Sequence, residues 1–409
     1  LRSLERRGVS TNIASFVGAT TVRMNILGHE NREPNEEEME KMKTLVEQAM
    51  QEGALGVGSS LIYPPAFYAS TNELIELCKI ASKYGGVYIS HMRSEGMNFI
   101  EALDEFIAIV RESKVKGEIY HLKAAGEINW KKMDIAIDKI EQARSEGLKI
   151  TTDMYLYTAA GTGLSSTLPP WVEEGGQEAF LARLKDRETR EKLKEQMLES
   201  TKDWENLYVE AGPENMLISS VSKEGLKSLM GKRVSEIAQS RGQDPRDTII
   251  DLLIQDETRI GTIYFIMSEE NVKKKIALPF MAFGSDAASM SAEGVFLENN
   301  AHPRAYGNFA RLLGKYIRDE KIITLQEGIR RLTSFPAGNL GLMNRGSLKS
   351  DFFADVVVFD SERIKDNATF DNPHQLADGM VHVWVNGTQV LNNGDHTGKF
   401  PGKFIKRQT

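Results

Sequence analysis

Val87-Tyr-Ile-Ser-His91 and Glu118-Ile-Tyr-His121 are two short apolar stretches that each end in a histidine. Both have the length and composition of a buried β-strand. A third stretch, Met281-Ala-Phe-Gly-Ser-Asp286, ends in a carboxylate. Polar side chains at the carboxyl ends of successive parallel strands are where a β/α barrel holds its chemistry. Two imidazoles and a carboxylate at one rim therefore predict a zinc-dependent hydrolase.

Strands and helices alternate around these stretches. Each predicted strand is followed within a few residues by apolar positions at helical spacing, and short connections of this kind indicate parallel βαβ units. Thr71 or Asn72 is the expected cap of the helix at 71–84, and Pro34 and Asn35 precede the helix at 36–52. We predict strands at 12–18, 53–60, 87–90, 117–122, 148–154 and 280–286, and helices at 36–52, 71–84, 98–113 and 131–146.

The number of strands bears on how much of a barrel is present. A closed barrel needs eight strands, and the pattern supplies six. The chain begins with Leu1 rather than Met. We therefore expect a metal-dependent hydrolase with a TIM-like (β/α)8 barrel, shortened at its N-terminus by the first two strands.

The alternation breaks after residue 163. Residues 178–204 are charged and helical, and an apolar strand is predicted at 215–221. A connection this long at a barrel mouth is typically a lid, although a separately folded decoration is the alternative. Turn signals then separate short strands at 346–349, 354–360 and 382–387. The expected organisation is barrel strands three to seven in 1–163, an insertion in 164–278, the last barrel strand with helices in 279–340, and a small β-sandwich portion in 341–409.

Composition excludes several classes of partner. The net charge is −7 over 409 residues, so neither nucleic acid nor an anionic membrane is an expected partner. No run of about 18 apolar residues exists, and no membrane span is predicted. Cys78 is the one cysteine, so no intrachain disulfide can form, which fits a cytoplasmic location.

His91, His121 and Asp286 are the first candidates for the site. Either histidine alone would most often be a hydrogen-bonded residue without a metal, but two that follow sequential strands reach neighbouring positions of one rim. Neutral imidazole is a common zinc ligand. Asp286 can act as the catalytic base toward water, or it can cap a helix in Ser285-Asp-Ala-Ala-Ser289.

Three further residues are candidates for substrate binding. Lys123 lies two residues beyond His121, and Arg304 lies in the loop after the last strand. This pair of cations can hold a substrate carboxylate. Tyr155 and Tyr157 follow the strand at 148–154, and one of their hydroxyls can donate to a developing oxyanion, while core packing is equally expected.

Several longer motifs run through the chain in a fixed order. They are Phe16-Val-Gly-Ala-Thr-Thr-Val-Arg23, Gly53-Ala-Leu-Gly-Val-Gly-Ser-Ser-Leu-Ile-Tyr-Pro-Pro65, Ile89-Ser-His-Met-Arg-Ser-Glu95, Tyr120-His-Leu-Lys-Ala-Ala-Gly126, Thr151-Thr-Asp-Met-Tyr155, Gly284-Ser-Asp-Ala287, His302-Pro-Arg-Ala-Tyr-Gly307, Ala354-Asp-Val-Val-Val-Phe-Asp360 and Gly398-Lys-Phe-Pro-Gly402. In this order they resemble the N-acyl-D-amino-acid deacylases, or D-aminoacylases, of the amidohydrolase superfamily.

The resemblance implies a role for each candidate. His91 and His121 match the family's zinc-binding histidines, with one or two zinc ions expected, and Asp286 matches its catalytic aspartate. Substrate-binding positions are matched by Lys123, Tyr155 and Arg304. The implied reaction is hydrolysis of the amide bond of a small N-acyl-D-amino acid.

The chain also departs from the family pattern. The family uses a His-x-His pair on its first strand and a cysteine or carboxylate soon after it, and this sequence contains no His-x-His. Cys78 falls mid-helix, where it is expected to be a small buried hydrophobe. Two alternatives therefore stay open. One is a dihydroorotase-like or hydantoinase-like cyclic amidohydrolase, which substitution of Arg304 would discriminate, and the other is an inactive fragment.

Overall fold

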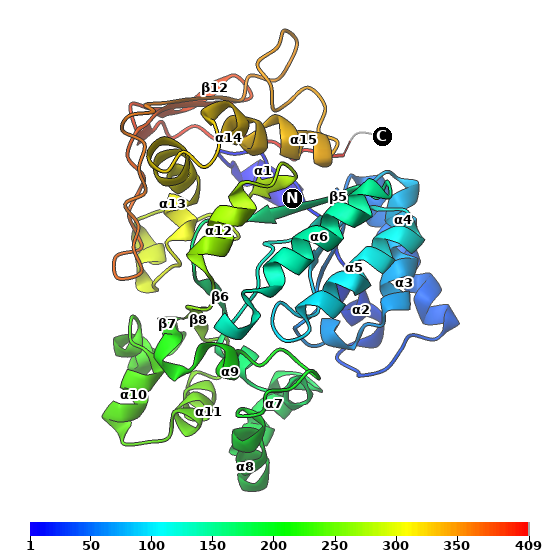
Figure 1. Ribbon diagram of the computed structural model, residues 1–409, viewed down its shortest axis with the longest axis vertical. Coiled ribbons are helices and arrows are strands. Elements are labelled where there is room, and N and C mark those ends of the chain that lie inside the picture. The colour runs from blue at the N-terminus through cyan, green and yellow to red at the C-terminus, as the bar shows by residue number, and fades with distance from the viewer. Residues whose placement is uncertain (408–409) are drawn as a thin grey trace.

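The computed structural model describes residues 1–407 of the chain. Its largest sheet has six parallel strands in the order β1-β2-β3-β4-β5-β9 (Figure 1). All six strands predicted from the sequence are present, although the first is confined to two residues. Their bounds are β1 (Val17–Gly18), β2 (Gly56–Ser60), β3 (Val87–His91), β4 (Lys116–Ile119), β5 (Ile150–Met154) and β9 (Met281–Phe283).

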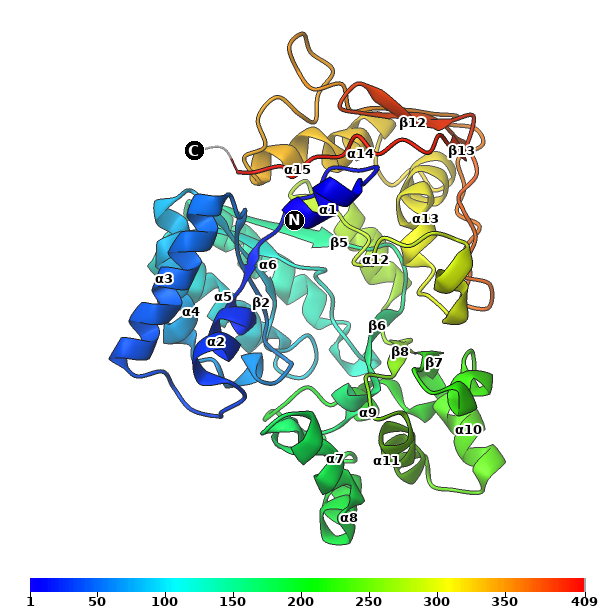
Figure 2. The same ribbon diagram turned by 180° about the vertical axis from the view of Figure 1, so that it is seen from behind.

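Helices connect the strands and cover the sheet. Figures 1 and 2 show α3 to α6 side by side along it. The four predicted helices are confirmed to within one residue at each end. The connecting elements are α2 (Ala19–Leu27), α3 (Glu36–Glu52), η1 (Ala66–Tyr68), α4 (Thr71–Lys83), α5 (Phe99–Ser113), η2 (Glu127–Asn129), α6 (Lys132–Ser145) and α12 (Glu269–Ile276).

Side-chain caps define where two of these helices begin. The side chain of Asn35 accepts from the backbone N–H of Glu38, and the Glu38 carboxylate accepts from that of Asn35, both at 2.9 Å. This reciprocal pair is a capping box. Ser70, and not the predicted Thr71 or Asn72, caps α4, because its hydroxyl accepts from the N–H three residues on.

A hydrophobic core fills the space between the sheet and its helices. Leu74 and Leu77 of α4 are fully buried in it. The rings of Tyr88 and Phe106 stack there at 5.5 Å. Close packing of this kind holds the strands in fixed positions, and their carboxyl ends with them.

Residues between the fifth and sixth parallel strands form a second unit, at the foot of Figures 1 and 2. Its antiparallel sheet has the order β6-β8-β7. Tyr155 and Tyr157 belong to its hydrophobic core, so this core reaches the carboxyl end of β5. The elements are β6 (Ala160–Gly163), η3 (Leu164–Thr167), η4 (Pro170–Glu173), α7 (Gln177–Lys185), α8 (Arg187–Gln196), α9 (Leu207–Ala211), η5 (Pro213–Asn215), β7 (Met216–Ser220), η6 (Glu224–Leu229), α10 (Val234–Arg241), α11 (Pro245–Asp256) and β8 (Gly261–Tyr264).

The C-terminal part contains helices followed by a four-stranded antiparallel sheet. Residues 346–349 form no strand, contrary to the prediction. Gly346 has a φ of +77°, and a Cβ there would lie 2.8 Å from the carbonyl oxygen of Thr333, so the backbone turns instead of extending. The elements are η7 (Gly294–Glu298), α13 (Arg304–Arg311), the π-helix η8 (Leu312–Asp319), α14 (Leu325–Leu332), α15 (Ser334–Asn339), β10 (Val356–Phe359), β11 (Met380–Val385), β12 (Thr388–Asn392) and β13 (Asp395–His396).

The N-terminal segment lies against the C-terminal one. Helix α1 (Arg2–Arg7) precedes two isolated bridges, Val9 to Pro401 and Ile13 to Phe404. These contacts join residues almost 400 positions apart in the chain. The domain boundaries expected at residues 163, 278 and 340 remain predictions.

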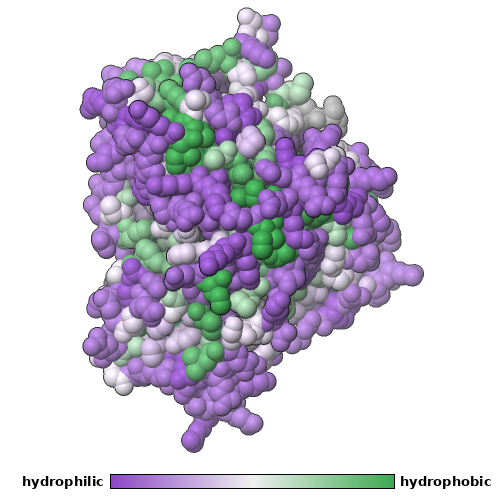
Figure 3. Space-filling view, in the orientation of Figure 1, coloured by the Kyte–Doolittle hydropathy of each residue, from purple (hydrophilic) through white to green (hydrophobic). Residues whose placement is uncertain are grey.

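Hydrophilic side chains cover most of the face in Figure 3, where apolar ones form separate patches. This distribution is ordinary for a folded protein. Within residues 1–407, no helix combines the length and the apolar character needed to span a bilayer.

Candidate active site

The predicted site residues meet at the carboxyl edge of the parallel sheet. His91 is the last residue of β3, and His121 follows β4 by two residues. Tyr155 directly follows β5, and Asp286 follows β9 by three. Because these four strands are successive neighbours in the sheet, their ends lie together.

His91 and His121 are in direct contact. Nδ1 of His91 lies 2.9 Å from Nε2 of His121, and the rings meet edge to face at 4.6 Å. Both residues are buried, at 7% and 5% exposed. Burial lowers the pKa of His91 to about 3, so its imidazole is neutral at neutral pH.

Glu95 joins the two histidines, although the sequence analysis gave it no role. Its Oε1 lies 3.1 Å from Nδ1 of His121, and its Oε2 lies 3.6 Å from Nε2 of His91. Glu95 stands four residues after His91 in an irregular loop, within the quoted motif that ends at Glu95. The signal in the sequence that could have identified Glu95 was its position only four residues after the candidate ligand His91.

Lys123 neutralises Glu95. Its ammonium lies 2.6 Å from both carboxylate oxygens and 2.7 Å from Nδ1 of His121. Burial, the largest single effect, would raise the pKa of Glu95, but Lys123 and the two histidines together outweigh it and hold that pKa well below its usual range. Glu95 is therefore a carboxylate, able to act as an oxygen donor.

The group formed by His91, Glu95 and His121 fits a divalent metal. One donor atom from each lies within 4.8 Å of the others, and all three residues are buried. Nε2 of His91 is buried and has no hydrogen-bond partner within residues 1–407. A polar atom in this state costs free energy unless something pairs with it. Two imidazoles and one carboxylate form a donor set that catalytic zinc sites use.

Asp286 pairs with Arg304. Its Oδ2 lies 2.9 Å from Nη1 of Arg304, and its Oδ1 accepts from the hydroxyl of Tyr120 at 3.0 Å. Asp286 caps no helix, because the next helical element begins at Gly294, so the alternative reading of this residue is wrong. Asp286 and His121 have φ values of +47° and +39°, a strained region for residues other than glycine that is concentrated at functional sites.

Tyr120 and Tyr155 connect the His91–Glu95–His121 group with the Asp286–Arg304 pair. The ring of Tyr120 lies 4.3 Å from that of His121, while its hydroxyl reaches Asp286. The ring of Tyr155 lies 4.4 Å from the guanidinium of Arg304 and 5.8 Å from the ammonium of Lys123. The structure thus brings all six predicted site residues to one edge.

Tyr157 and His302 have different environments. The Tyr157 hydroxyl contacts Asp366 at 3.3 Å, away from the histidine pair. Nε2 of His302 lies 2.9 Å from the carbonyl oxygen of Ala159, and its Nδ1 accepts from the backbone N–H of Arg304 at 3.1 Å. His302 therefore helps to hold Arg304 in place.

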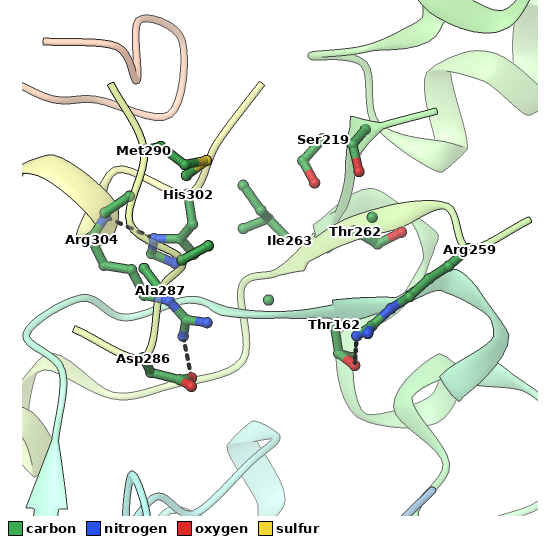
Figure 4. Close-up of a pocket in the computed structure, with 15 residues that line it drawn as sticks. Thr162, Ser219, Arg259, Thr262, Ile263, Asp286, Ala287, Met290, His302 and Arg304 are labelled. Atoms are coloured by element: carbon green, nitrogen blue, oxygen red, sulfur yellow. Dashed lines mark hydrogen bonds and ion pairs between the residues drawn. The ribbon is translucent and has the colours of Figure 1, made fainter. Parts of the chain in front are cut away.

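A cavity of about 280 Å³ opens beside the Asp286–Arg304 pair (Figure 4). This is near the lower end of the range for small-molecule sites. The walls that face this pair come from the second unit, through β6, β7 and residues 259–263 at the start of β8. They include Thr162, Ser219 and Arg259, and the sequence analysis singled out none of these.

The second unit also places two acidic residues behind the Glu95 loop. A carboxylate oxygen of Glu205 accepts from the backbone N–H of Glu95. Burial, followed by the charge of Glu95, raises the pKa of Glu205 to about 7. Both carboxylate oxygens of Glu210 are buried without a hydrogen-bond partner among the residues described.

Comparison with known proteins identifies the family. A model of the Amidohydrolase family matches residues 281–391. D-aminoacylase of Alcaligenes xylosoxydans xylosoxydans is 31% identical over 407 residues, covering 100% of this chain and 72% of that protein. The chain belongs to the D-aminoacylase family of amidohydrolases.

Other members of this family are similar over the same span. N-acyl-D-aspartate deacylase of the same organism is 29% identical, over 99% of this chain and 70% of its own length. The solved structure of N-acyl-D-glutamate deacylase from Bordetella bronchiseptica, complexed with zinc and a phosphonate inhibitor, superposes with a TM-score of 0.80 at 26% identity, covering 99% and 74% of the two chains. The fold is accordingly the TIM-like α/β barrel of the amidohydrolases, as the sequence predicted.

Proposed function

We propose that the protein hydrolyses the amide bond of N-acyl-D-amino acids, giving a carboxylate and a free D-amino acid. One observation carries the proposal. The His91–Glu95–His121 group and the Asp286–Arg304 pair lie at one edge of the sheet, connected by Tyr120. A metal site beside a carboxylate base and a buried guanidinium suits an anionic amide substrate.

Zinc is the metal that we propose, as one or two ions. His91, Glu95 and His121 would hold it, in agreement with the three protein ligands typical of catalytic zinc. A bound zinc ion supplies Lewis acidity toward the acyl carbonyl and the attacking water.

Arg304 is the main anchor for the substrate α-carboxylate in this proposal. It is 6% exposed, and its Nε has no hydrogen-bond partner within the described chain. Its Nη1 lies close to Asp286 without the alignment of a hydrogen bond, so donor capacity remains for a ligand. Lys123, which contacts Glu95 and His121, is the second cation for this carboxylate. Positioning the substrate in this way contributes much of the rate of amide hydrolysis.

Asp286 and Tyr155 would act on the reacting atoms. The carboxylate of Asp286 takes a proton from the attacking water and delivers it to the leaving nitrogen. The hydroxyl of Tyr155 contacts the sulfur of Met267 at 3.3 Å, a weak acceptor that it can exchange for the developing oxyanion.

The direct test is turnover of N-acetyl-D- and N-acetyl-L-amino acids with zinc added. We expect only the D series to react. Asp286→Asn should lower kcat by about 10²- to 10⁴-fold with little change in KM, whereas Asp134→Asn, at an exposed ion pair, should have no effect. Activity on the L series alone, or on cyclic amides alone, would refute the proposal.

We propose a cytoplasmic location. Cys78 is the one cysteine of the chain and is buried in α4. A protein without a disulfide is typical of a reducing compartment. Fractionation of cells that produce the protein, followed by detection with an antibody, tests this assignment.

A further inference from the structure

Two arginines lie on opposite sides of the cavity described above. In Figure 4, Arg304 at the start of α13 lies on one side of the cavity, paired with Asp286 from the loop after β9. Arg259 points in from the opposite wall. Arg304 is already committed to the α-carboxylate in the proposed function. Arg259 has no assigned role.

Arg259 has few partners of its own. It is exposed, and its Nη2 donates to Oγ1 of Thr162 at 3.3 Å. No carboxylate lies within ion-pair distance of Arg259 in residues 1–407. In a chain with a net charge of −7, such a guanidinium is a local positive site at the mouth of a cavity.

The Arg259 side of the cavity is also built from polar groups. Thr162, Ser219, Ser220 and Thr262 contribute hydroxyls. Oγ1 of Thr262 is buried without a hydrogen-bond partner in the described residues. The hydroxyls of Ser219 and Ser220 crowd Gly261, where a Cβ would lie only 2.9 and 2.2 Å from them. An apolar substituent would leave these groups unpaired, whereas a carboxylate would accept from them.

Arg259 is physically connected to the histidine pair. The Thr162 hydroxyl that Arg259 contacts lies 2.7 Å from the hydroxyl of Tyr63. The ring of Tyr63 in turn lies 5.5 Å from that of His91. Arg259 also lines the same cavity as Asp286 and Arg304, so a group held at Arg259 would share one cavity with these two residues.

We propose that Arg259 binds a second carboxylate of the substrate, so that the preferred substrates are dianionic N-acyl-D-amino acids. This inference rests on the proposed function. The second carboxylate belongs either to the amino-acid side chain, as in N-acetyl-D-glutamate, or to the acyl group, as in N-succinyl-D-leucine. Arg259, Thr162 and Thr262 are the residues that would recognise it.

The test compares matched pairs of substrates. For the side chain these are N-acetyl-D-glutamate and its neutral isostere N-acetyl-D-glutamine, and for the acyl group N-succinyl-D-leucine and N-acetyl-D-leucine. We expect the zinc-loaded protein to favour the dianion of one pair, and Arg259→Met to reduce that preference about 10- to 100-fold, the range for hydrogen bonds to charged groups. Arg187→Met, at an exposed arginine at the start of α8, is the control and should leave both ratios unchanged.

The outcomes separate the two proposals. A loss confined to the glutamate pair assigns the side chain, and a loss confined to the succinyl pair assigns the acyl group. Unchanged ratios in both pairs overturn the inference while leaving the deacylase proposal intact. If no substrate is turned over, the proposed function is wrong. The role of Arg259 in carboxylate binding is then tested by calorimetric dissociation constants for the same four compounds. Equal affinity of the wild-type protein and Arg259→Met for both dianions overturns its role.

Discussion

The ammonium of Lys123 lies 2.6 Å from both carboxylate oxygens of Glu95, and neither side chain is more than 5% exposed. Removing one partner of a buried ion pair leaves an uncompensated charge and costs about 3–5 kcal/mol. We predict that Lys123→Met lowers the free energy of unfolding of metal-free protein by about this amount. Urea denaturation in the presence of a chelator measures it.

The same variant should respond to zinc. A cation bound by Glu95 would replace the lost ammonium charge, so saturating zinc should recover most of the stability. The matched control is Lys139→Met at the exposed pair with Asp104, where a loss of no more than about 1 kcal/mol is expected. Equal losses with and without zinc would contradict a role for Glu95 in metal binding.

Substituting either histidine should weaken zinc binding. We predict that His91→Ala and His121→Ala each lower zinc affinity by more than about 100-fold, beyond the effect of removing an outer partner of a ligand. Competition with a chromogenic chelator measures the dissociation constant. His29→Ala, at an exposed histidine of the α2–α3 connection, should bind zinc as the wild-type protein does. Unchanged affinity in both site variants would exclude the histidine pair as ligands.

The positions of His91, His121 and Asp286 could be predicted because strand ends can be recognised locally. Each follows an apolar run of strand length, and parallel neighbours in a sheet end at one edge. The six strands and four of the connecting helices, α3 to α6, follow from the same local patterns, whereas α2 and α12 were not predicted. The predicted strand at 346–349 failed because Gly346 takes a positive φ, which apolar patterning does not report.

Glu95 and Arg259 could not be recognised in the same way. Glu95 lies in an irregular loop, and its place in the site depends on contacts with His121 and Lys123. Arg259 enters the cavity because β8 pairs with β6, a contact between segments about 100 residues apart. Neither relationship has a periodic signal in the sequence.

Glu327 should stabilise the fold in a pH-dependent way. Hydrogen bonds from Arg330, and then from the buried Arg331, lower the pKa of Glu327 to about 2 from an ordinary 4.5. Because the folded-state pKa is the lower one, this stabilisation is present above pH 4.5 and is lost as the pH falls toward 2. We predict that Glu327→Gln costs about 1–3 kcal/mol at pH 7 and progressively less below pH 4.5.

Urea denaturation of both proteins from pH 7 to pH 3 checks this prediction. Glu191→Gln, at an exposed pair with Lys194, is the control and should stay within about 1 kcal/mol of the wild-type protein. A stability difference that does not shrink on acidification would show that Glu327 acts through packing rather than charge.

Glu210 should destabilise the protein at neutral pH. Both its carboxylate oxygens are buried without a partner in the described chain, and burial, followed by the charge of Glu205, raises its pKa well above the usual value. A raised pKa in an acid means that the fold is most stable with the proton on, so stability falls as the pH rises from about 4.5. We predict that Glu210→Gln is more stable than the wild-type protein by about 1–3 kcal/mol at pH 8 and equally stable at pH 4.5.

Paired denaturation curves at pH 8 and pH 4.5 decide the question, with Glu214→Gln as the control from the adjoining turn η5. A stabilising effect at pH 8 that disappears at pH 4.5 assigns the cost to the buried charge, since the two side chains have nearly the same shape. Destabilisation at both values would instead mean that the Glu210 carboxyl, which crowds Gly96 directly after Glu95, holds that loop in place through its shape. In that case Glu210→Gln should also weaken zinc binding, which the chelator competition used for the histidine variants would detect.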